Sequence, residues 1–173
     1  MSGDRTATAV TPVVTLSALP LKSFSRGESY ASADNRVADL MGLTRLGATY
    51  SEVPPGKSGC PYHVHHALDE MFVILEGSGR YRFGEATYEV QAGDVLGAPR
   101  GGAEFAHKLT NTGTTPLKFL AISSAATTDV CEYPDSGKLA AASDIGTDAG
   151  GFRFIGRANT ACGYWDDEPD SAD

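Results

Sequence analysis

The sequence predicts an all-β protein built around one antiparallel sandwich or barrel, and two observations carry this prediction. Between residues 44 and 123, short runs rich in β-branched and aromatic residues alternate with Gly- and Pro-containing turns. No long amphipathic helical pattern interrupts them, and no unit repeats along the chain. A length of 173 residues with 41% hydrophobic residues suits one domain with a sizeable core.

The expected strands follow one another closely. They are residues 44–53, 71–75, 80–83, 86–90, 95–98, 106–111 and 116–123. Residues 71–75 (MFVIL) are apolar at every position, as expected for a strand buried between two sheets. Because strand side chains alternate between faces, Phe72 and Ile74 share the side of Glu70 and are expected inside the barrel.

The chain before the barrel, residues 1–43, is expected to be an N-terminal arm. Residues 1–11 are rich in Ser, Thr and Ala and predict a loose tail, whereas residues 13–16 suit a short strand. Residues 37–43 fit either a short helix or a strand entry, and the sequence leaves both open. The barrel itself is assigned to residues 44–124.

Residues 125–173 are expected to form a C-terminal extension that packs on the barrel or on a partner subunit. Residues 131–138 predict a loop and residues 151–156 predict a strand. Tyr164 and Trp165 form an aromatic pair in a polar tail. Such a pair usually packs against its own domain or a partner, and less often stacks on a ligand.

Charge and cysteine content narrow the class of protein. With 14 Lys+Arg against 22 Asp+Glu, the net charge of −8 disfavours binding to nucleic acid or anionic membranes. No run approaches the ~20 apolar residues of a membrane helix, and no signal peptide is evident. The three cysteines, Cys60, Cys131 and Cys162, form neither a disulfide framework nor a CxxC pair, so a cytoplasmic location is expected.

The chemistry concentrates where the histidines lie. The chain has four histidines, three in residues 61–77 and one, His107, in residues 93–111. In a strand, His63 and His65 point to the same face, and Glu70 follows after four residues. Imidazole nitrogens and a carboxylate together suit a divalent metal. His66 is expected to point away from this face.

These two segments resemble the motifs of the cupin superfamily. The first motif is matched in type and spacing by His63, His65, Glu70 and Gly77, and the second, in order, by Gly93, Pro99, Gly101, His107 and Asn111. Two departures are evident: Lys57 stands where the first motif begins with Gly, and the loop of residues 100–106 is three residues longer than the motif allows. The resemblance covers roughly residues 44–123.

The resemblance implies a small double-sheet β-barrel of the jelly-roll type. It also implies that His63, His65, Glu70 and His107 bind one divalent transition metal (Mn, Fe, Ni or Zn), with no catalytic residue assigned. More loosely, the chain is similar to single-barrel cupins provisionally assigned as sugar-phosphate isomerases. The expected protein is a homodimer acting on a small polar metabolite as an isomerase or dioxygenase. The alternative is a cupin that binds or senses a small molecule without turnover.

Two arginines are candidate substrate clamps. Arg80 and Arg82 share one face of their strand. An inward Arg would bind a carboxylate or phosphate through its forked guanidinium. A solvated outer face is the preferred interpretation.

Overall fold

The protein is described here by a computed structural model that covers residues 10–145 and 151–169. Thirteen strands form the described part of the chain, with one short helix, α1 (Val37–Leu40), and three 3-10 turns, η1 (Leu16–Ala18), η2 (Ala103–Phe105) and η3 (Ala158–Thr160). The strands are β1 (Lys22–Arg26), β2 (Tyr30–Arg36), β3 (Leu46–Val53), β4 (Val64–His65), β5 (Glu70–Glu76), β6 (Ser78–Phe83), β7 (Ala86–Gln91), β8 (Val95–Ala98), β9 (His107–Asn111), β10 (Leu117–Ser124), β11 (Thr128–Tyr133), β12 (Lys138–Ser143) and β13 (Arg153–Arg157).

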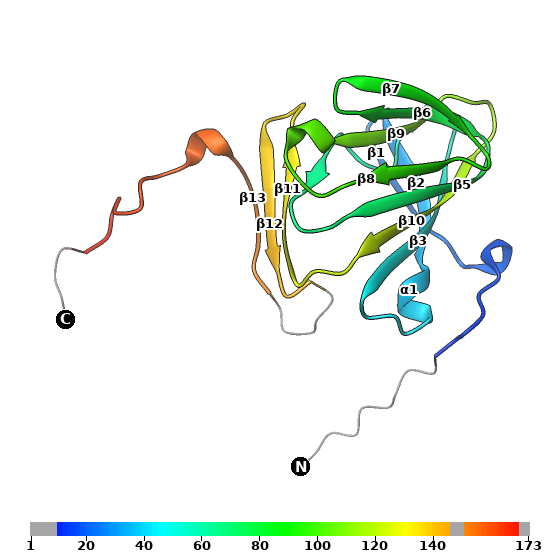
Figure 1. Cartoon of the computed structure of the whole chain (residues 1–173), viewed down its shortest axis with the longest axis horizontal. Coiled ribbons are helices and arrows are strands. Elements are labelled where there is room, and N and C mark those ends of the chain that lie inside the picture. Colours follow the sequence, from blue (N-terminus) through cyan, green and yellow to red (C-terminus); the bar gives the residue numbers. More distant parts are fainter. Residues whose placement is uncertain (1–9, 146–150, 170–173) are drawn as a thin grey trace, which may run out of the picture.

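The strands form three antiparallel sheets, which confirms the predicted all-β jelly-roll class. A six-stranded sheet has the order β1-β2-β3-β10-β5-β8, and a three-stranded sheet has the order β7-β6-β9. These two sheets face each other across the core (Figure 1). A four-stranded sheet, β13-β12-β11-β4, stands at one end of the barrel.

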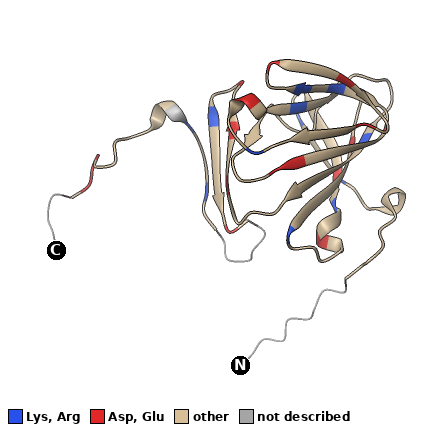
Figure 2. Cartoon of the chain, viewed as in Figure 1, with Lys and Arg blue, Asp and Glu red and all other residues tan. Residues whose placement is uncertain are grey.

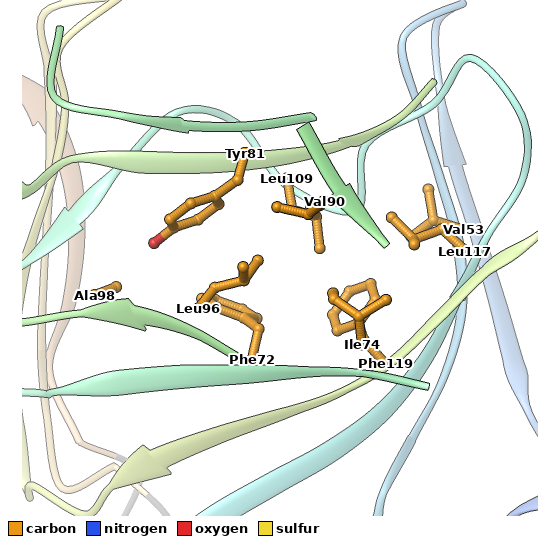
Figure 3. Close-up of a cluster of buried hydrophobic side chains, with 10 residues drawn as sticks. All are labelled: Val53, Phe72, Ile74, Tyr81, Val90, Leu96, Ala98, Leu109, Leu117 and Phe119. Atoms are coloured by element: carbon orange, nitrogen blue, oxygen red, sulfur yellow. The ribbon is translucent and has the colours of Figure 1, made fainter. Parts of the chain in front are cut away.

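The core lies between the inward faces of the first two sheets (Figure 3). Its buried side chains come from seven strands: Val53, Phe72, Ile74, Tyr81, Val90, Leu96, Ala98, Leu109, Leu117 and Phe119. Alternation along β5 places Phe72 and Ile74 in this core, as predicted. The expectation that residues 71–75 are buried on both faces is wrong for the single chain, because Met71 and Leu75 are 39% and 40% exposed.

The N-terminal arm contributes strands to the large sheet. β2 pairs with β3, and Asp34 lies opposite Ser51. The sequence YASADNR of β2 has no apolar alternation, so the strand was not predicted. The predicted strand at residues 13–16 is wrong: the chain there has no ladder partner and enters η1, between Pro12 and Pro20, which lack backbone donors. Residues 37–43, which fit either a short helix or a strand entry, begin with the helix α1. Residues 1–9 of the expected tail lie outside the described residues.

The C-terminal extension also forms strands. The loop predicted at residues 131–138 is wrong, because β11 and β12 form a hairpin whose turn is confined to residues 134–137. Pro134 and Gly137 mark that turn, and Gly137 has a φ of 62°, which favours glycine. The strand expected at residues 151–156 is confirmed as β13.

The surface carries both signs of charge. Basic and acidic residues are interspersed over the barrel strands and are not gathered by sign (Figure 2). None of the helices in the described ranges has the length and apolar character needed to cross a membrane.

Candidate metal centre

Three separate segments bring the candidate ligands together. His65 lies on β4, Glu70 begins β5 and His107 begins β9. His63 precedes β4 and pairs with His107 through two backbone hydrogen bonds, with N···O distances of 3.1 and 2.7 Å. These backbone pairs hold the imidazoles of two distant segments on the same side of the barrel wall.

The three imidazoles converge on one carboxylate oxygen. The Nε2 atoms of His107, His65 and His63 lie 3.1, 3.5 and 3.8 Å from Oε2 of Glu70. With metal–ligand distances of about 2.0–2.2 Å, neighbouring donors of one ion are separated by about 3 Å. The spacing between these donor atoms therefore suits a common metal ion.

The opposite nitrogen of each ring has its own acceptor. Nδ1 of His63 lies 2.9 Å from the carbonyl oxygen of Pro61, and Nδ1 of His107 lies 3.4 Å from that of Phe105. Nδ1 of His65 lies 2.5 Å from Oδ2 of Asp129. When Nδ1 carries the proton, Nε2 presents a lone pair toward Glu70. Lone pairs facing a carboxylate repel it, so this donor set fits a cation at its centre.

Burial and neighbouring charges favour the metal-binding protonation states. Burial, followed by the adjacent His107, lowers the pKa of His63 to about 4, so its ring is neutral near pH 7. Burial alone would raise the pKa of Glu70, but close contact with His107 and the neighbouring His65 and His63 lower it overall. A neutral imidazole and an ionised carboxylate are the forms that coordinate divalent ions.

A second group of donors overlaps this site. His63, His65 and Cys131 have donor atoms within 4.8 Å of one another. Burial raises the pKa of the Cys131 thiol to about 11, so the thiol is protonated near neutral pH. A protonated thiol is a weak ligand, and Glu70 is therefore the better fourth donor.

Asp129 is a site residue that the sequence analysis missed. Its side chain is buried, and it accepts hydrogen bonds from His65 and from the backbone N of Ala67. It lies 64 residues after His65, on β11, whose neighbouring residues pair with β4. No spacing in the sequence links the two, since the contact arises only from strand pairing.

A cavity of about 350 Å³ adjoins the candidate ligands. His63, Glu70 and His107 line one part of it, and apolar residues of the core line another. The remaining wall is polar and comes from β2 and β3: Ser32, Asp34, Thr49 and Ser51. This volume is at the small end of ligand sites, which indicates a small molecule.

The longer loop of residues 100–106 closes over the ligand strand. The backbone N of Gly101 donates to the carbonyl oxygen of His65 at 3.0 Å, and that of Arg100 donates to Oδ1 of Asp69 at 3.0 Å. A Cβ atom at Gly101 would lie 2.5 Å from the ring of Phe105, so glycine permits this close packing. The loop thus fixes the backbone beside two predicted ligands.

The other predicted residues lie outside the centre. His66 is exposed and pairs with Glu132 at 2.7 Å, which confirms that it points away from the ligands. Arg80 pairs with Glu89, and Arg82 makes two contacts with Asp135 of 2.9 and 2.8 Å. The side chains of both arginines are 55% and 43% exposed, which confirms that they lie on a solvated outer face.

The aromatic tail does not cover the barrel of the same chain. Tyr164 and Trp165 are 84% and 77% exposed, and their rings contact each other edge-to-face at 4.7 Å. The segment after β13 runs away from the barrel in Figure 1. Packing of this pair on its own barrel is therefore wrong, whereas packing on a partner subunit stays a prediction.

Comparison with known proteins identifies the domain type. Residues 49–123 match the cupin domain family. A 71-residue segment is 35% identical to an oxalate-binding protein of Thermotoga maritima, covering 41% of this chain and 55% of that protein. The chain spans about half the length of the curated relatives it matches.

Solved structures show the same fold. A provisionally assigned sugar phosphate isomerase of Acidithiobacillus ferrooxidans superposes with a TM-score of 0.74 at 24% identity, covering 87% of this chain and 94% of that one. At this identity, the likeness supports the fold alone. A predicted oxalate decarboxylase of Thermotoga maritima superposes with a TM-score of 0.57 at 27% identity, covering 66% of this chain and 99% of that one.

Proposed function

Residues 49–123 of this chain form a cupin domain, and from this premise we propose that the protein is a divalent-metal-dependent enzyme acting on a small polar metabolite. The observation that supports it is the convergence of three imidazole Nε2 atoms within 3.1–3.8 Å of one Glu70 oxygen. The proposed ligands are His63, His65, Glu70 and His107. The metal is a transition ion such as Mn, Fe, Ni or Zn, since mixed N and O donors suit this group.

The chain's own residues prepare the site in two ways. Asp129, Pro61 and Phe105 orient the imidazoles through their Nδ1 atoms. The loop of residues 100–106 fixes the chain at His65 and Asp69 through two backbone donors. A bound divalent ion would supply Lewis-acid polarisation of a substrate oxygen. This arrangement is compatible with isomerase or dioxygenase chemistry. Oxygenation would require a redox-active ion such as Fe, and isomerisation would require a base beside the metal.

The second candidate is binding or sensing of a small molecule without turnover. The similarity to an oxalate-binding protein favours this second candidate, because the name of that relative states binding and no reaction. Turnover assays separate the two candidates: oxygen uptake or isomerisation by the metal-loaded protein supports the enzyme, and saturable binding without product supports the sensor.

The proposal extends to assembly and location. We propose a homodimer in which outer apolar residues of the barrel and the exposed tail are covered by a second copy. All three cysteines are free in the described part of the chain, which agrees with a reducing, cytoplasmic setting.

Metal analysis tests the proposed ligands. The purified protein should contain close to one transition-metal ion per chain by elemental mass spectrometry. His65→Ala, Glu70→Gln and His107→Ala should each lose most of that metal. His66→Ala is the matched control, because this exposed ring adjoins His65 yet pairs with Glu132. Metal-free wild-type protein that also fails to take up Mn, Fe, Ni or Zn on addition would contradict the proposal.

A further inference from the structure

A second carboxylate lines the cavity, on a strand distant from that of Glu70 in the six-stranded sheet. Asp34 of β2 lines the same cavity as Glu70, although β10 and β3 separate their strands in the sheet. Ser32 donates a hydrogen bond to Oδ2 of Asp34 at 2.5 Å. An ionised carboxylate has about four acceptor sites, so one hydroxyl leaves the others available to a ligand.

No positive side chain neutralises this carboxylate. Among the residues that the structure describes, no Lys or Arg lies within ion-pair distance of Asp34. None of the residues that line the cavity is Lys or Arg either. The candidate clamps Arg80 and Arg82 pair with Glu89 and Asp135 outside the cavity. Lys108 acts electrostatically on Cys60 of the cavity wall but forms no ion pair with Asp34. An anionic group reaching the Asp34 end would therefore meet a like charge that no Lys or Arg pairs with directly.

The polarity of the wall changes across the sheet. Strand pairing places Phe119 opposite both Ile74 and Ser51, and Ser51 opposite Asp34. The wall thus runs from apolar side chains to hydroxyls and then to a carboxylate. Ser32, Thr49 and Ser51 are hydroxyls that both donate and accept hydrogen bonds. Such a wall complements the hydroxyl groups of a ligand.

The carboxylates of the site outnumber the positive charges of one divalent ion. Glu70, Asp34 and the buried Asp129 behind His65 each contribute one negative charge, and neutral imidazoles contribute none. In a partly enclosed site, a further negative charge introduced by the ligand is unfavourable. A neutral ligand adds no charge, whereas oxalate or a sugar phosphate would add negative charge.

We propose that Asp34 is the specificity-determining residue of this site, and that the ligand is an uncharged polyhydroxy compound that donates a hydroxyl hydrogen bond to it. Asp34 selects for hydroxyl donors and against anions. This inference rests on the proposed metal-binding function and deepens it. It also separates this chain from its oxalate-binding relative in ligand chemistry.

The test measures how Asp34→Asn changes the binding of neutral polyhydroxy probes and of an anionic probe. Full-length Mn-loaded protein is titrated calorimetrically with three neutral probes, erythritol, ribitol and D-ribose, and with oxalate. Asp34→Asn keeps the side-chain shape and removes the charge. Asp34→Glu keeps the charge, and Asp39→Asn is a control at an exposed carboxylate paired with Arg36. Metal content and melting temperature are measured for every variant.

The expected signature is a pair of opposite changes. At least one neutral probe binds the wild type, and Asp34→Asn weakens that binding about five- to tenfold, because a charge-assisted hydrogen bond becomes a neutral one. Asp34→Asn strengthens oxalate binding several-fold, because repulsion is removed. Asp34→Glu retains discrimination against oxalate, and Asp39→Asn behaves as the wild type.

The failures are distinguishable. Wild-type protein that binds no metal overturns the proposed function and this inference with it. If metal content is normal but no neutral probe binds, only the role of Asp34 is overturned. The same holds if Asp34→Asn changes the affinities for the neutral probe and for oxalate in the same direction, or changes neither affinity. If Asp34→Asn does not fold, Ser32→Ala and Asp34→Glu are titrated with the same probes instead. Unchanged affinity for every probe in both folded variants overturns the inference.

Discussion

The Nδ1 atom of His65 lies 2.5 Å from Oδ2 of Asp129, which joins a predicted metal ligand to a buried carboxylate of the C-terminal hairpin. This contact fixes the ring and directs its Nε2 atom toward Glu70. The hairpin is therefore part of the candidate metal centre, although it supplies none of the proposed ligands.

Removing the charge of this carboxylate should weaken metal binding. In Asp129→Asn the ring of His65 loses a charged acceptor, so metal affinity should fall about 10–100-fold. Competition with a chelating dye measures the change. Asp135→Asn is the control, since Asp135 lies at the tip of the same hairpin and pairs with exposed Arg82. Equal affinities for wild type and Asp129→Asn would contradict the orienting role.

Chelation should lower the melting temperature. Metal at 100 times its dissociation constant stabilises the folded state by about 2.7 kcal/mol. For a domain of this size, that corresponds to roughly 5–11 °C, at about 2–4 °C per kcal/mol. Thermal melts with and without EDTA should show this shift in wild type and in His66→Ala. His107→Ala should lose most of it; a full EDTA shift in His107→Ala would remove this residue from the ligand set.

Acid should destabilise the metal-free protein. Burial lowers the pKa of folded His63 to about 4, whereas an unfolded histidine titrates near 6.5. Between these values the unfolded state binds the extra proton, so stability falls as pH decreases through this window, by up to about 1.4 kcal/mol per pH unit. The pKa of Glu70 is also lowered on folding, so protonation of this carboxylate acts in the same direction at still lower pH.

Urea unfolding of the EDTA-treated protein from pH 7.5 to pH 4.5 measures this dependence. His63→Gln is the comparison, because glutamine does not titrate. The slope of unfolding free energy against pH should be smaller in His63→Gln than in wild type. Parallel slopes would show that His63 is not the titrating group.

Neighbouring residues of β5 should differ sharply in their contribution to stability. Ile74 is 1% exposed in the core, whereas Leu75 is 40% exposed on the outer face. Ile74→Ala should cost about 2–5 kcal/mol of unfolding free energy through lost contacts and a cavity. Leu75→Ala should change it by about 0.5 kcal/mol or less in the monomer. Denaturant titration measures both, and equal losses would contradict the alternation of β5.

Light scattering tests the proposed dimer. Met71, Leu75 and Val95 leave apolar area on the outer face of the large sheet, at 39%, 40% and 60% exposure. Association of two copies would bury this area together with the aromatic tail. A mass near twice 18.1 kDa is expected at micromolar concentration. Only the 18.1 kDa species would contradict the homodimer.

Local patterns predicted most of the barrel and the four proposed ligands. Turn residues and alternation identified the strands that carry Phe72 and Ile74, because each pattern is contained within a few residues. The spacing of His63, His65 and Glu70 was informative for the same reason, since short strands and turns hold these residues near one another.

The missed elements have a different physical origin. β2 lines the polar part of the cavity wall, so Ser32 and Asp34 stand where a core strand would be apolar. Asp129 acquires its role through pairing of β11 with β4, which no local pattern encodes. The loop predicted at residues 131–138 includes the last three residues of β11, because Pro134 and Gly137 follow them closely. Polar side chains that line the cavity thus interrupt the apolar alternation by which strands are identified.

The pairing of β4 with β11 bears on when the site can assemble during protein synthesis. His65 leaves the ribosome 64 residues before Asp129 does, and at about 5–20 residues per second this interval lasts roughly 3–13 seconds. Until then β4 has no strand partner and its imidazole has no carboxylate to orient it. The orientation of His65 by Asp129 is therefore a later event than synthesis of the four proposed ligands. A nascent chain ending at residue 123 would already carry all four ligands but would lack the carboxylate that orients His65.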